Sequence, residues 1–249
     1  MIFSLKTFVE GFGSIVLFSY ISFKNIFSRH LCFNRVFTEI YQIGIKSIPV
    51  CNITILFVGM VFTFQIIQEF IKFGATKLIG GVVALAIVRE LSPLLIGVVA
   101  CARIGASITA ELGTMSVTEQ IDALKVMGKN PISYLVTPKL MGSVISLPVL
   151  VGVGNIVGFL GGLIIVLLMN KINPYSYFSA ADIMLTNYDI FCGLIKAGFF
   201  GFIIAIISCY HGLNCHRGAQ SVGINTTKSV VYSLISIFIV NFFLSTLLF

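Results

Sequence analysis

Long apolar runs alternate with short polar connections along the chain. A transmembrane helix needs about 20 mostly apolar residues, and four runs meet this length: 47–68, 138–169, 190–210 and 229–249. A fifth run, 82–110, is long enough but contains Arg89, Glu90 and Arg103. Strands of a membrane barrel alternate apolar and polar residues, whereas these runs are continuous. The pattern predicts an all-α integral membrane protein with five transmembrane helices.

The first 46 residues form a separate N-terminal region, ahead of the membrane domain expected at 47–249. Residues 11–23 carry no charge, but this run is too short for a span. Phenylalanines recur here at spacings that favour a helix lying in the membrane interface: Phe3, Phe8, Phe12 and Phe18. A sixth span is the alternative. No small-residue cleavage site follows that would indicate a signal peptide.

Composition supports a membrane protein and gives it an orientation. The 249 residues are 57% hydrophobic and 10% charged, whereas soluble domains carry about 25% charged residues. With five spans, basic residues gather on the side that holds the N-terminus: Lys6, Lys24, Arg29, Arg35, Lys46, Lys125, Lys129, Lys139, Arg217 and Lys228. The other side has only Lys72, Lys77 and Lys171. The positive-inside rule therefore puts the N-terminus and residues 111–137 on the cytoplasmic-type side, with the C-terminus across the membrane.

The net charge of +7 fits this bias, and no basic patch interleaved with aromatic residues indicates nucleic-acid binding. Small residues recur every four positions in two spans, which allows close helix packing. These stripes are Gly154, Gly158 and Gly162 in the third span and Gly193, Ala197, Gly201 and Ala205 in the fourth. We favour internal packing of the bundle over a subunit interface.

Four charges lie inside the predicted spans, where a lone charge is costly and usually faces a partner or a cavity. Arg103 follows Arg89 by fourteen residues, close to four helical turns, so both should point to nearly the same side. Pro93 should kink this helix. One interpretation is a set of internal salt bridges, with Lys196 pairing Glu90 and Arg89 pairing another carboxylate. The other is a polar strip along a cavity.

The segment 111–131, ELGTMSVTEQIDALKVMGKNP, is polar enough to lie outside the membrane. Ser116 and Glu119 have the spacing of a capping box, and Gly128 followed by Pro131 is typical of a helix end. The predicted helix, about 117–127, is too short to cross a bilayer. Its apolar residues share one face: Val117, Ile121, Leu124 and Met127. Both a helix resting on lipid and a docking helix fit this pattern.

Signatures of catalysis and of cofactors are missing from the sequence. No GxxxxGK[ST] phosphate loop is present, and the cysteines and histidines of CYHGLNCH, residues 209–216, do not have the spacing of a zinc site. We therefore expect no metal, no cofactor and no enzymatic activity in this chain. ATP hydrolysis, if it drives the protein, would occur in a partner.

The chain closely resembles the MlaE family of ABC-transporter lipid permeases over residues 89–140, RELSPLLIGVVACARIGASITAELGTMSVTEQIDALKVMGKNPISYLVTPKL, and the match continues through GVGNIVGFLGG to the C-terminus. The resemblance implies an N-terminal interfacial helix, five spans and a homodimer. It also implies a cytoplasmic- or stromal-side ATPase and an MCE-domain substrate-binding protein across the membrane. The membrane would be a bacterial inner membrane or the plastid inner envelope.

Family positions carry over where the motifs match. The intramembrane arginine–glutamate pair of the family matches Arg89 and Glu90, and its fourth-span lysine matches Lys196. Relatives often have an aspartate in the last span where this chain has Asn241, so its charge network must differ. With Arg103, these four residues are the candidate lining of a polar cavity.

The resemblance also assigns the polar segment to the coupling helix of such permeases, at about 114–128. The candidate residues for ATPase coupling are Glu111, Thr118, Glu119, Asp122, Lys125 and Met127. The resulting hypothesis is a permease that moves phospholipid or a related glycerolipid under the drive of a partner ATPase. A stand-alone secondary transporter or channel that uses the intramembrane charges is the alternative, although no internal repeat supports it. A membrane scaffold is a third hypothesis.

Overall fold

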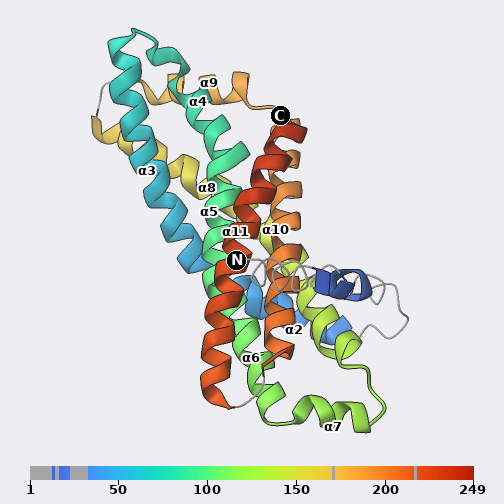
Figure 1. Cartoon of the computed structure of the whole chain (residues 1–249). Coiled ribbons are helices and arrows are strands. Elements are labelled where there is room, and N and C mark those ends of the chain that lie inside the picture. Colours follow the sequence, from blue (N-terminus) through green and yellow to red (C-terminus); the bar gives the residue numbers. More distant parts are fainter. Residues whose placement is uncertain (1–12, 15–16, 23–32, 170–171, 216–217) are drawn as a thin grey trace, which may run out of the picture.

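The computed structural model describes residues 13–14, 17–22, 33–169, 172–215 and 218–249. Figure 1 shows a bundle of long helices, and no strand occurs in the described ranges. Five helical segments are long and apolar enough to cross a membrane: Asn34–Lys72, Thr76–Val117, Ile132–Met169, Asn187–Leu213 and Ala219–Leu248. The predicted all-α integral membrane protein with five spans is confirmed.

The individual elements divide some of these segments. The first contains α2 (Phe33–Ile43), the 3-10 turn η1 (Ile45–Ser47) and α3 (Ile48–Lys72). The second contains η2 (Thr76–Leu78), α4 (Ile79–Ala86), η3 (Ile87–Leu91), α5 (Ser92–Ala100), η4 (Cys101–Gly105) and α6 (Ala106–Val117). The short α7 (Gln120–Val126) and η5 (Ile132–Val136) precede α8 (Thr137–Met169). Then follow α9 (Pro174–Met184), α10 (Asn187–Leu213) and α11 (Ala219–Leu248).

The second span contains two π-helical turns, η3 and η4, where a simple kink was predicted. Pro93 lies two residues after the end of η3, in the first turn of α5. Proline lacks the N–H that an α-helix would use and clashes with the carbonyl four residues earlier. A π turn bonds i to i+5 instead, and such turns are typically single-turn insertions in α-helices. The widened turn therefore accommodates the proline within a continuous span.

Small residues bring the helix backbones close together inside the chain. A Cβ on Gly59 of α3 would lie 2.3 Å from the backbone oxygen of Gly158 on α8. A Cβ on Gly201 of α10 would lie 2.6 Å from the backbone oxygen of Ser143, also on α8. Side chains at both positions would push these helices apart. The interpretation of the two glycine stripes as internal packing is confirmed.

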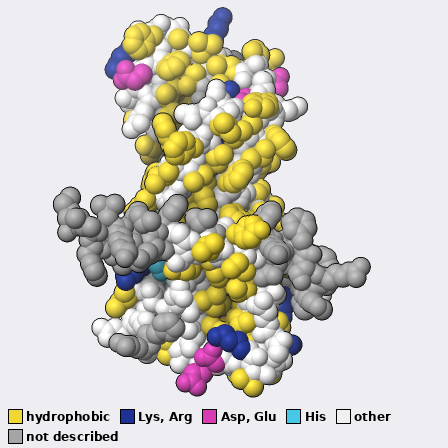
Figure 2. Space-filling model, turned by 45° about the vertical axis from the view of Figure 1, so that its right-hand side comes forward, with side chains coloured by type: hydrophobic (Ala, Val, Ile, Leu, Met, Phe, Trp, Pro, Cys, Tyr) yellow, Lys and Arg dark blue, Asp and Glu magenta, His cyan; other side chains and the backbone are white. Residues whose placement is uncertain are grey.

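The two ends of the bundle differ in what they carry (Figure 1). We call the end with α7 the lower end and the end with α9 and the C-terminus the upper end. Figure 2 shows hydrophobic side chains across the middle of one face, with charged side chains gathered toward both ends. The C-terminus thus lies opposite α7, as the charge distribution predicted.

Most of the N-terminal region is outside the described residues, including Phe3, Phe8 and Phe12. The predicted interfacial helix therefore stays a prediction, as does the boundary at residue 46. Phe18 is described, and its ring packs edge-on against Tyr210 of α10 at a centroid distance of 5.9 Å. This contact ties residue 18 to the body of the bundle.

Candidate functional site

A buried ionic cluster lies between the second, fourth and fifth spans. Lys196 of α10 is fully buried and donates hydrogen bonds to Glu90 Oε1 at 2.8 Å, to Ser245 Oγ at 2.8 Å and to the backbone oxygen of Arg89 at 3.0 Å. An ammonium group has three donors, and all three are used. The predicted pairing of Lys196 with Glu90 is confirmed.

Asn241 completes this cluster from α11. Its Nδ2 donates to Glu90 Oε2 at 3.1 Å, while Ser245 Oγ donates to Glu90 Oε1 at 2.8 Å. The amide therefore stabilises the carboxylate of Glu90 and does not serve as a counter-ion for Lys196. This geometry explains how the chain works with asparagine at a position where an aspartate was expected from the family resemblance. We name Glu90, Lys196, Asn241 and Ser245 the upper cluster.

Arg89 pairs with a carboxylate, as the salt-bridge interpretation predicted, although the sequence did not identify which one. Its Nε and Nη2 contact Asp189 Oδ1 at 2.8 and 2.7 Å. Asp189 is buried in the first turn of α10, where its Oδ2 also accepts hydrogen bonds from Thr186 N and Oγ1 at 2.9 and 2.6 Å. Thr186 and Asp189 have the spacing of a capping box. That signal was present in the sequence, but the contact with Arg89 across 100 positions was not.

Arg103 lies apart from Arg89, contrary to the prediction that both point to one side. It donates to the hydroxyl of Ser47 at the junction of η1 and α3, whereas Arg89 contacts α10. The prediction assumed an undisturbed helix of 3.6 residues per turn. Each arginine instead lies within a π turn, which changes the angular relation between them. The predicted single polar strip is therefore divided.

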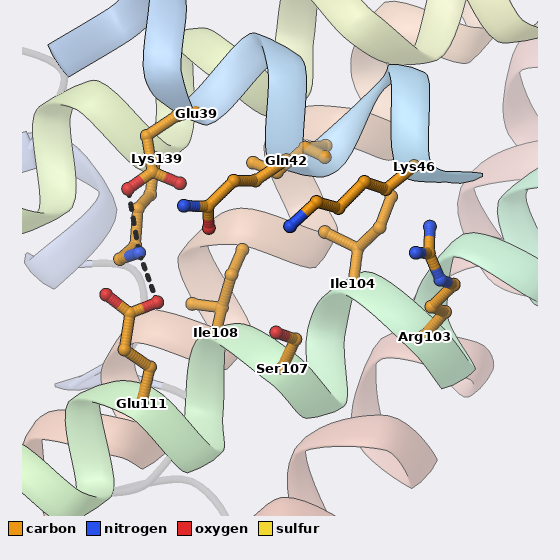
Figure 3. Close-up of a pocket in the computed structure, with 10 residues that line it drawn as sticks. Glu39, Gln42, Lys46, Arg103, Ile104, Ser107, Ile108, Glu111 and Lys139 are labelled. Atoms are coloured by element: carbon orange, nitrogen blue, oxygen red, sulfur yellow. Dashed lines mark hydrogen bonds and ion pairs between the residues drawn. The ribbon is translucent and has the colours of Figure 1, made fainter. Parts of the chain in front are cut away.

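A second ionic group lies nearer the lower end, beside Arg103 (Figure 3). Lys139 of α8 is buried and contacts Glu39 of α2 at 2.8 Å and Glu111 of α6 at 2.7 Å. These residues, with Lys46 and Arg103, line a cavity of about 130 Å³. Lys139 was counted in the sequence only as a flanking positive charge. We name Glu39, Glu111 and Lys139 the lower cluster.

Glu111 of α6 was a candidate residue for ATPase coupling. Its side chain is half exposed, but its carboxylate binds Lys139. It therefore links α6 to α8 inside the chain rather than presenting a free charge. Its predicted role in ATPase coupling would therefore be indirect and would act through the lower cluster.

The polar segment after the second span begins its helix later than predicted. Ser116 lies in the last turn of α6, where its hydroxyl donates to the backbone oxygen of Cys215 at 2.9 Å. Glu119 adopts a left-handed conformation, with φ of 59°, and α7 starts at Gln120. The predicted capping box is wrong because Ser116 binds the end of α10 instead. The helix end is as predicted, with Gly128 at φ of 74°.

One side of α7 packs on the protein, and the rest is exposed. Ile121 and Leu124 are buried, whereas Val126 and Met127 are 89% and 65% exposed. The predicted apolar face therefore holds only in part, because the chain leaves the helix before Met127 can follow Leu124 inward. We define the α7 surface as Thr118, Glu119, Asp122, Lys125, Val126 and Met127.

Two charges on the α7 surface pair with each other. Asp122 and Lys125 form an i,i+3 pair at 2.8 Å and are 67% and 60% exposed. Thr118 Oγ1 donates to the backbone oxygen of Thr114, closing the end of α6. An exposed ion pair such as Asp122–Lys125 contributes about 0–1 kcal/mol to the free energy of unfolding, so folding does not require it. The charges are free to meet a partner.

The described side chains offer binding and coupling groups. Within the described ranges, no three His, Cys, Asp or Glu residues are placed to hold a metal ion. The upper cluster supplies a polar patch in an apolar bundle, and α7 supplies a mixed polar and apolar surface. Such an arrangement can bind an amphipathic molecule and transmit movement between helices.

Comparisons with known proteins agree with this architecture. The family model described as Permease MlaE matches residues 36–247. A probable ABC transporter permease protein of the cyanobacterium Synechocystis is 46% identical over 211 residues, which cover 85% of this chain and 80% of the relative. A probable ABC transporter permease protein of Rickettsia typhi is 40% identical, covering 97% of this chain and 93% of the relative.

Plant and algal proteins match as well. The chloroplastic protein TRIGALACTOSYLDIACYLGLYCEROL 1 of Arabidopsis thaliana is 42% identical, covering 85% of this chain and 60% of the relative. A probable ABC transporter permease protein of Pyropia yezoensis is 40% identical, covering 87% and 82%. With the five spans, these relatives indicate an integral membrane protein of a plastid or bacterial inner membrane. The chain belongs to the MlaE family of ABC-transporter permeases.

Proposed function

We propose that the chain is the membrane subunit of an ABC transporter that moves a glycerolipid, driven by a separate ATPase that docks on the α7 surface. The exposed α7 surface carries this proposal. It lies at the lower end, where the basic flanks of the spans gather, and it stands between two spans. Exposed charges and the exposed Val126 and Met127 give a partner both polar and apolar contacts.

The connections of α7 provide a route for movement. Its N-terminal end joins α6 and its C-terminal end joins α8 through η5. Lys139 holds α6, α8 and α2 together through Glu111 and Glu39. A push on α7 would therefore move two spans jointly, rather than bending a loop. The closing of the ATPase would tilt these spans and change the shape of a cavity around the lipid.

A paired arrangement of two permeases would supply that cavity. α11 is the least covered span: 11% of its most apolar stretch is buried within the chain, against 56% for α10. Large apolar side chains are exposed along it, among them Ile235, Phe238 and Phe242. A second copy of the chain would cover this face. The upper cluster, whose Asn241 belongs to α11, would then lie close to the cavity between the copies.

Lipid as substrate is supported by the chemistry of the bundle and by one relative. The Arabidopsis protein is named after a glycerolipid, trigalactosyldiacylglycerol. Here, apolar helix faces would hold acyl chains. Arg89, whose side chain is 39% exposed, could meet a polar head group, because a guanidinium binds phosphate and carbonyl oxygens through several donors. An MCE-domain protein would bind at the upper end and exchange the lipid.

The test is charge reversal on α7 in the complete transporter, reconstituted in liposomes with an ABC-type ATPase subunit encoded in the same genome. Glu119→Lys with Asp122→Lys should weaken ATPase association and lower ATP-dependent transfer of a fluorescent phospholipid at least tenfold. The matched control reverses Glu69 and Lys72, an exposed i,i+3 pair at 2.8 Å on α3. Unchanged association and transfer in the α7 variant would contradict the proposal.

A further inference from the structure

The cavity beside the lower cluster has a surplus of positive charge (Figure 3). It has a volume of about 130 Å³ and lies between α2, η1, η4, α6 and α8. Three basic and two acidic side chains line it: Lys46, Arg103, Lys139, Glu39 and Glu111. Because Lys139 binds both carboxylates, Lys46 and Arg103 have no acidic partner in the part of the chain that the structure describes. The lining therefore has one net positive charge, which a group with a single negative charge would balance.

Arg103 has hydrogen-bond donors that the chain does not use. Its Nη1 donates to the hydroxyl of Ser47. Within the described ranges, Nε and Nη2 have no acceptor, and neither of these nitrogens is buried. Arg103 lines the cavity, so the two donors are available to a ligand there. A guanidinium binds the oxygens of a phosphate through two parallel N–H donors, which makes phosphate the natural complement of this side chain.

Further polar groups surround the same space. Figure 3 shows the ammonium of Lys46, the amide of Gln42 and the hydroxyl of Ser107 turned toward the gap between α2 and α6. All three residues are exposed, so a ligand can enter between them. The lower cluster lies on the side of the cavity opposite Arg103. An anion held by Arg103 and Lys46 would therefore lie away from the two carboxylates.

The size of the cavity suits a polar head group rather than a whole lipid. A water molecule takes about 30 Å³, so the volume of about 130 Å³ admits a group of several heavy atoms, such as a phosphate. Pockets that enclose a drug-sized molecule measure about 300–1,000 Å³. The acyl chains of a lipid would therefore lie outside the cavity, on the surface of the bundle.

An apolar stripe on α3 begins one turn after Lys46. Val50, Ile53 and Phe57 follow at spacings of four, three and four residues, which keeps them on one side of the helix, and all three are exposed. Neighbouring α2 and η1 expose further large apolar side chains: Phe37, Tyr41 and Ile45. From the level of the cavity, α3 runs toward the upper end (Figure 1). A lipid with its phosphate in the cavity can thus lay its acyl chains along the stripe, whereas a free phosphate gains nothing from it.

We propose that this cavity binds the phosphodiester of an anionic lipid from the leaflet at the lower end, through Arg103 and Lys46. Basic pockets between transmembrane helices on the cytoplasmic side bind lipid head groups in this way. Phosphatidylglycerol has the required single negative charge, and its hydroxyls can donate to Glu39 and Glu111, each of which has one carboxylate oxygen without a hydrogen bond in the described ranges. The site goes beyond the proposed function, because the transported lipid would lie near the upper cluster and binding here requires neither an ATPase nor a second copy of the chain.

The test uses the full chain in nanodiscs that contain dioleoylphosphatidylglycerol and dioleoylphosphatidylcholine in equal mole fractions. Native mass spectrometry counts the lipids retained by the released protein. The wild type should prefer phosphatidylglycerol, because choline cancels the charge of its phosphate and has no hydrogen-bond donor. Lys46→Gln should lower this preference about fivefold, since one hydrogen bond to a charged group is weakened. Arg103→Gln should lower it about tenfold, because the guanidinium supplies two donors.

Two further variants separate the cavity from general charge effects. Lys77→Gln is the matched control, because exposed Lys77 is the middle residue of η2, as Lys46 is of η1, and it lies before the next span at the other end of the bundle. Its preference should equal that of the wild type. Ser107→Leu keeps every charge but fills the cavity, and should abolish the preference.

Three results would overturn the site: equal retention of both lipids by the wild type, a preference that survives Ser107→Leu, or the same loss in Lys77→Gln as in Lys46→Gln. A last arm distinguishes the two sources of phosphate. Inorganic phosphate added to the nanodiscs should leave the retained phosphatidylglycerol unchanged, because it lacks the contacts of acyl chains with α3. Displacement of the lipid by inorganic phosphate would overturn the assignment of a lipid to the cavity.

Discussion

Lys196 and Lys125 each bind a carboxylate at 2.8 Å, yet they stand in opposite surroundings. Lys196 is 0% exposed and uses all three donors inside the bundle, whereas Lys125 is 60% exposed and meets only Asp122. A buried charge must be satisfied by the chain, because desolvation is expensive. An exposed charge is satisfied by water and contributes little to folding. The difference separates charges that hold the bundle together from charges available to a partner.

Removing the charge of Lys196 should have the largest effect on folding. Lys196→Met leaves Glu90 without its cation; because the side chain of Glu90 is 41% exposed, the cost should lie at the lower end of the about 3–5 kcal/mol that losing one partner of a fully buried pair costs. The free energy of unfolding, measured by titration of detergent micelles with sodium dodecyl sulfate, should fall by this amount. The double variant Glu90→Gln with Lys196→Met should recover most of the loss. If Lys196→Met alone is as stable as wild type, the upper cluster does not stabilise the fold.

Arg89→Ala should have a smaller effect, because Asp189 keeps two hydrogen bonds from Thr186. Leaving a buried acceptor partly unpaired costs about 1–3 kcal/mol. Lipid transfer per folded protein, measured beside stability, then separates two roles. Transfer that falls further than the folded fraction means that Arg89 meets the lipid. Transfer that follows the folded fraction means that Arg89 serves only Asp189.

Ser116→Ala should lower stability by about 1 kcal/mol, the typical contribution of one hydrogen bond. The hydroxyl joins the end of α6 to the backbone after α10. Amide hydrogen exchange around Cys215 should increase in the variant, while α7 keeps its own protection because its helix begins beyond Ser116. Loss of protection in α7 without change at Cys215 would restore the capping role first predicted for this serine.

Asp122→Ala should have the smallest effect on folding, under about 0.5 kcal/mol, because the residue is exposed and its pair is weak. The variant should instead weaken the association of the ATPase with the permease. The same measurement on Glu69→Ala, from the equivalent exposed pair on α3, gives the comparison. A large loss of stability in Asp122→Ala would mean that the charges of α7 hold the bundle together, as Lys196 does.

The sequence predicted those features that depend on local pattern. Continuous apolar runs located the five spans, and glycine spacing located the close contacts of α8, because both follow from helix periodicity. The pairing of Lys196 with Glu90 was predictable since a buried charge needs a partner. Gly128 ended α7 as expected because glycine readily adopts a positive φ.

Features that depend on distant parts of the chain were not predictable. Asp189 resembles a local helix cap, and its contact with Arg89 exists only once the second and fourth spans pack together. In the sequence, Lys139 resembles a charge that flanks a span, and only the folded chain places it between Glu39 of α2 and Glu111 of α6. Arg103 was misplaced because π turns do not follow the usual helical period. The cavity of about 670 Å³ that residues of α4, η3, α8, α9 and α10 line depends on the packing of these separate elements, which no local pattern encodes.

The central claim, that α7 contacts an ATPase, is tested most directly by site-specific photo-crosslinking in the native membrane. A photoreactive amino acid replaces Val126, 89% exposed in the last turn of α7, or Phe73, 80% exposed beyond the end of α3. Irradiation should give an adduct with an ABC-type ATPase from Val126 and none from Phe73. The account would be contradicted if the photoreactive residue at position 126 gave no adduct, or if both positions gave adducts in equal yield.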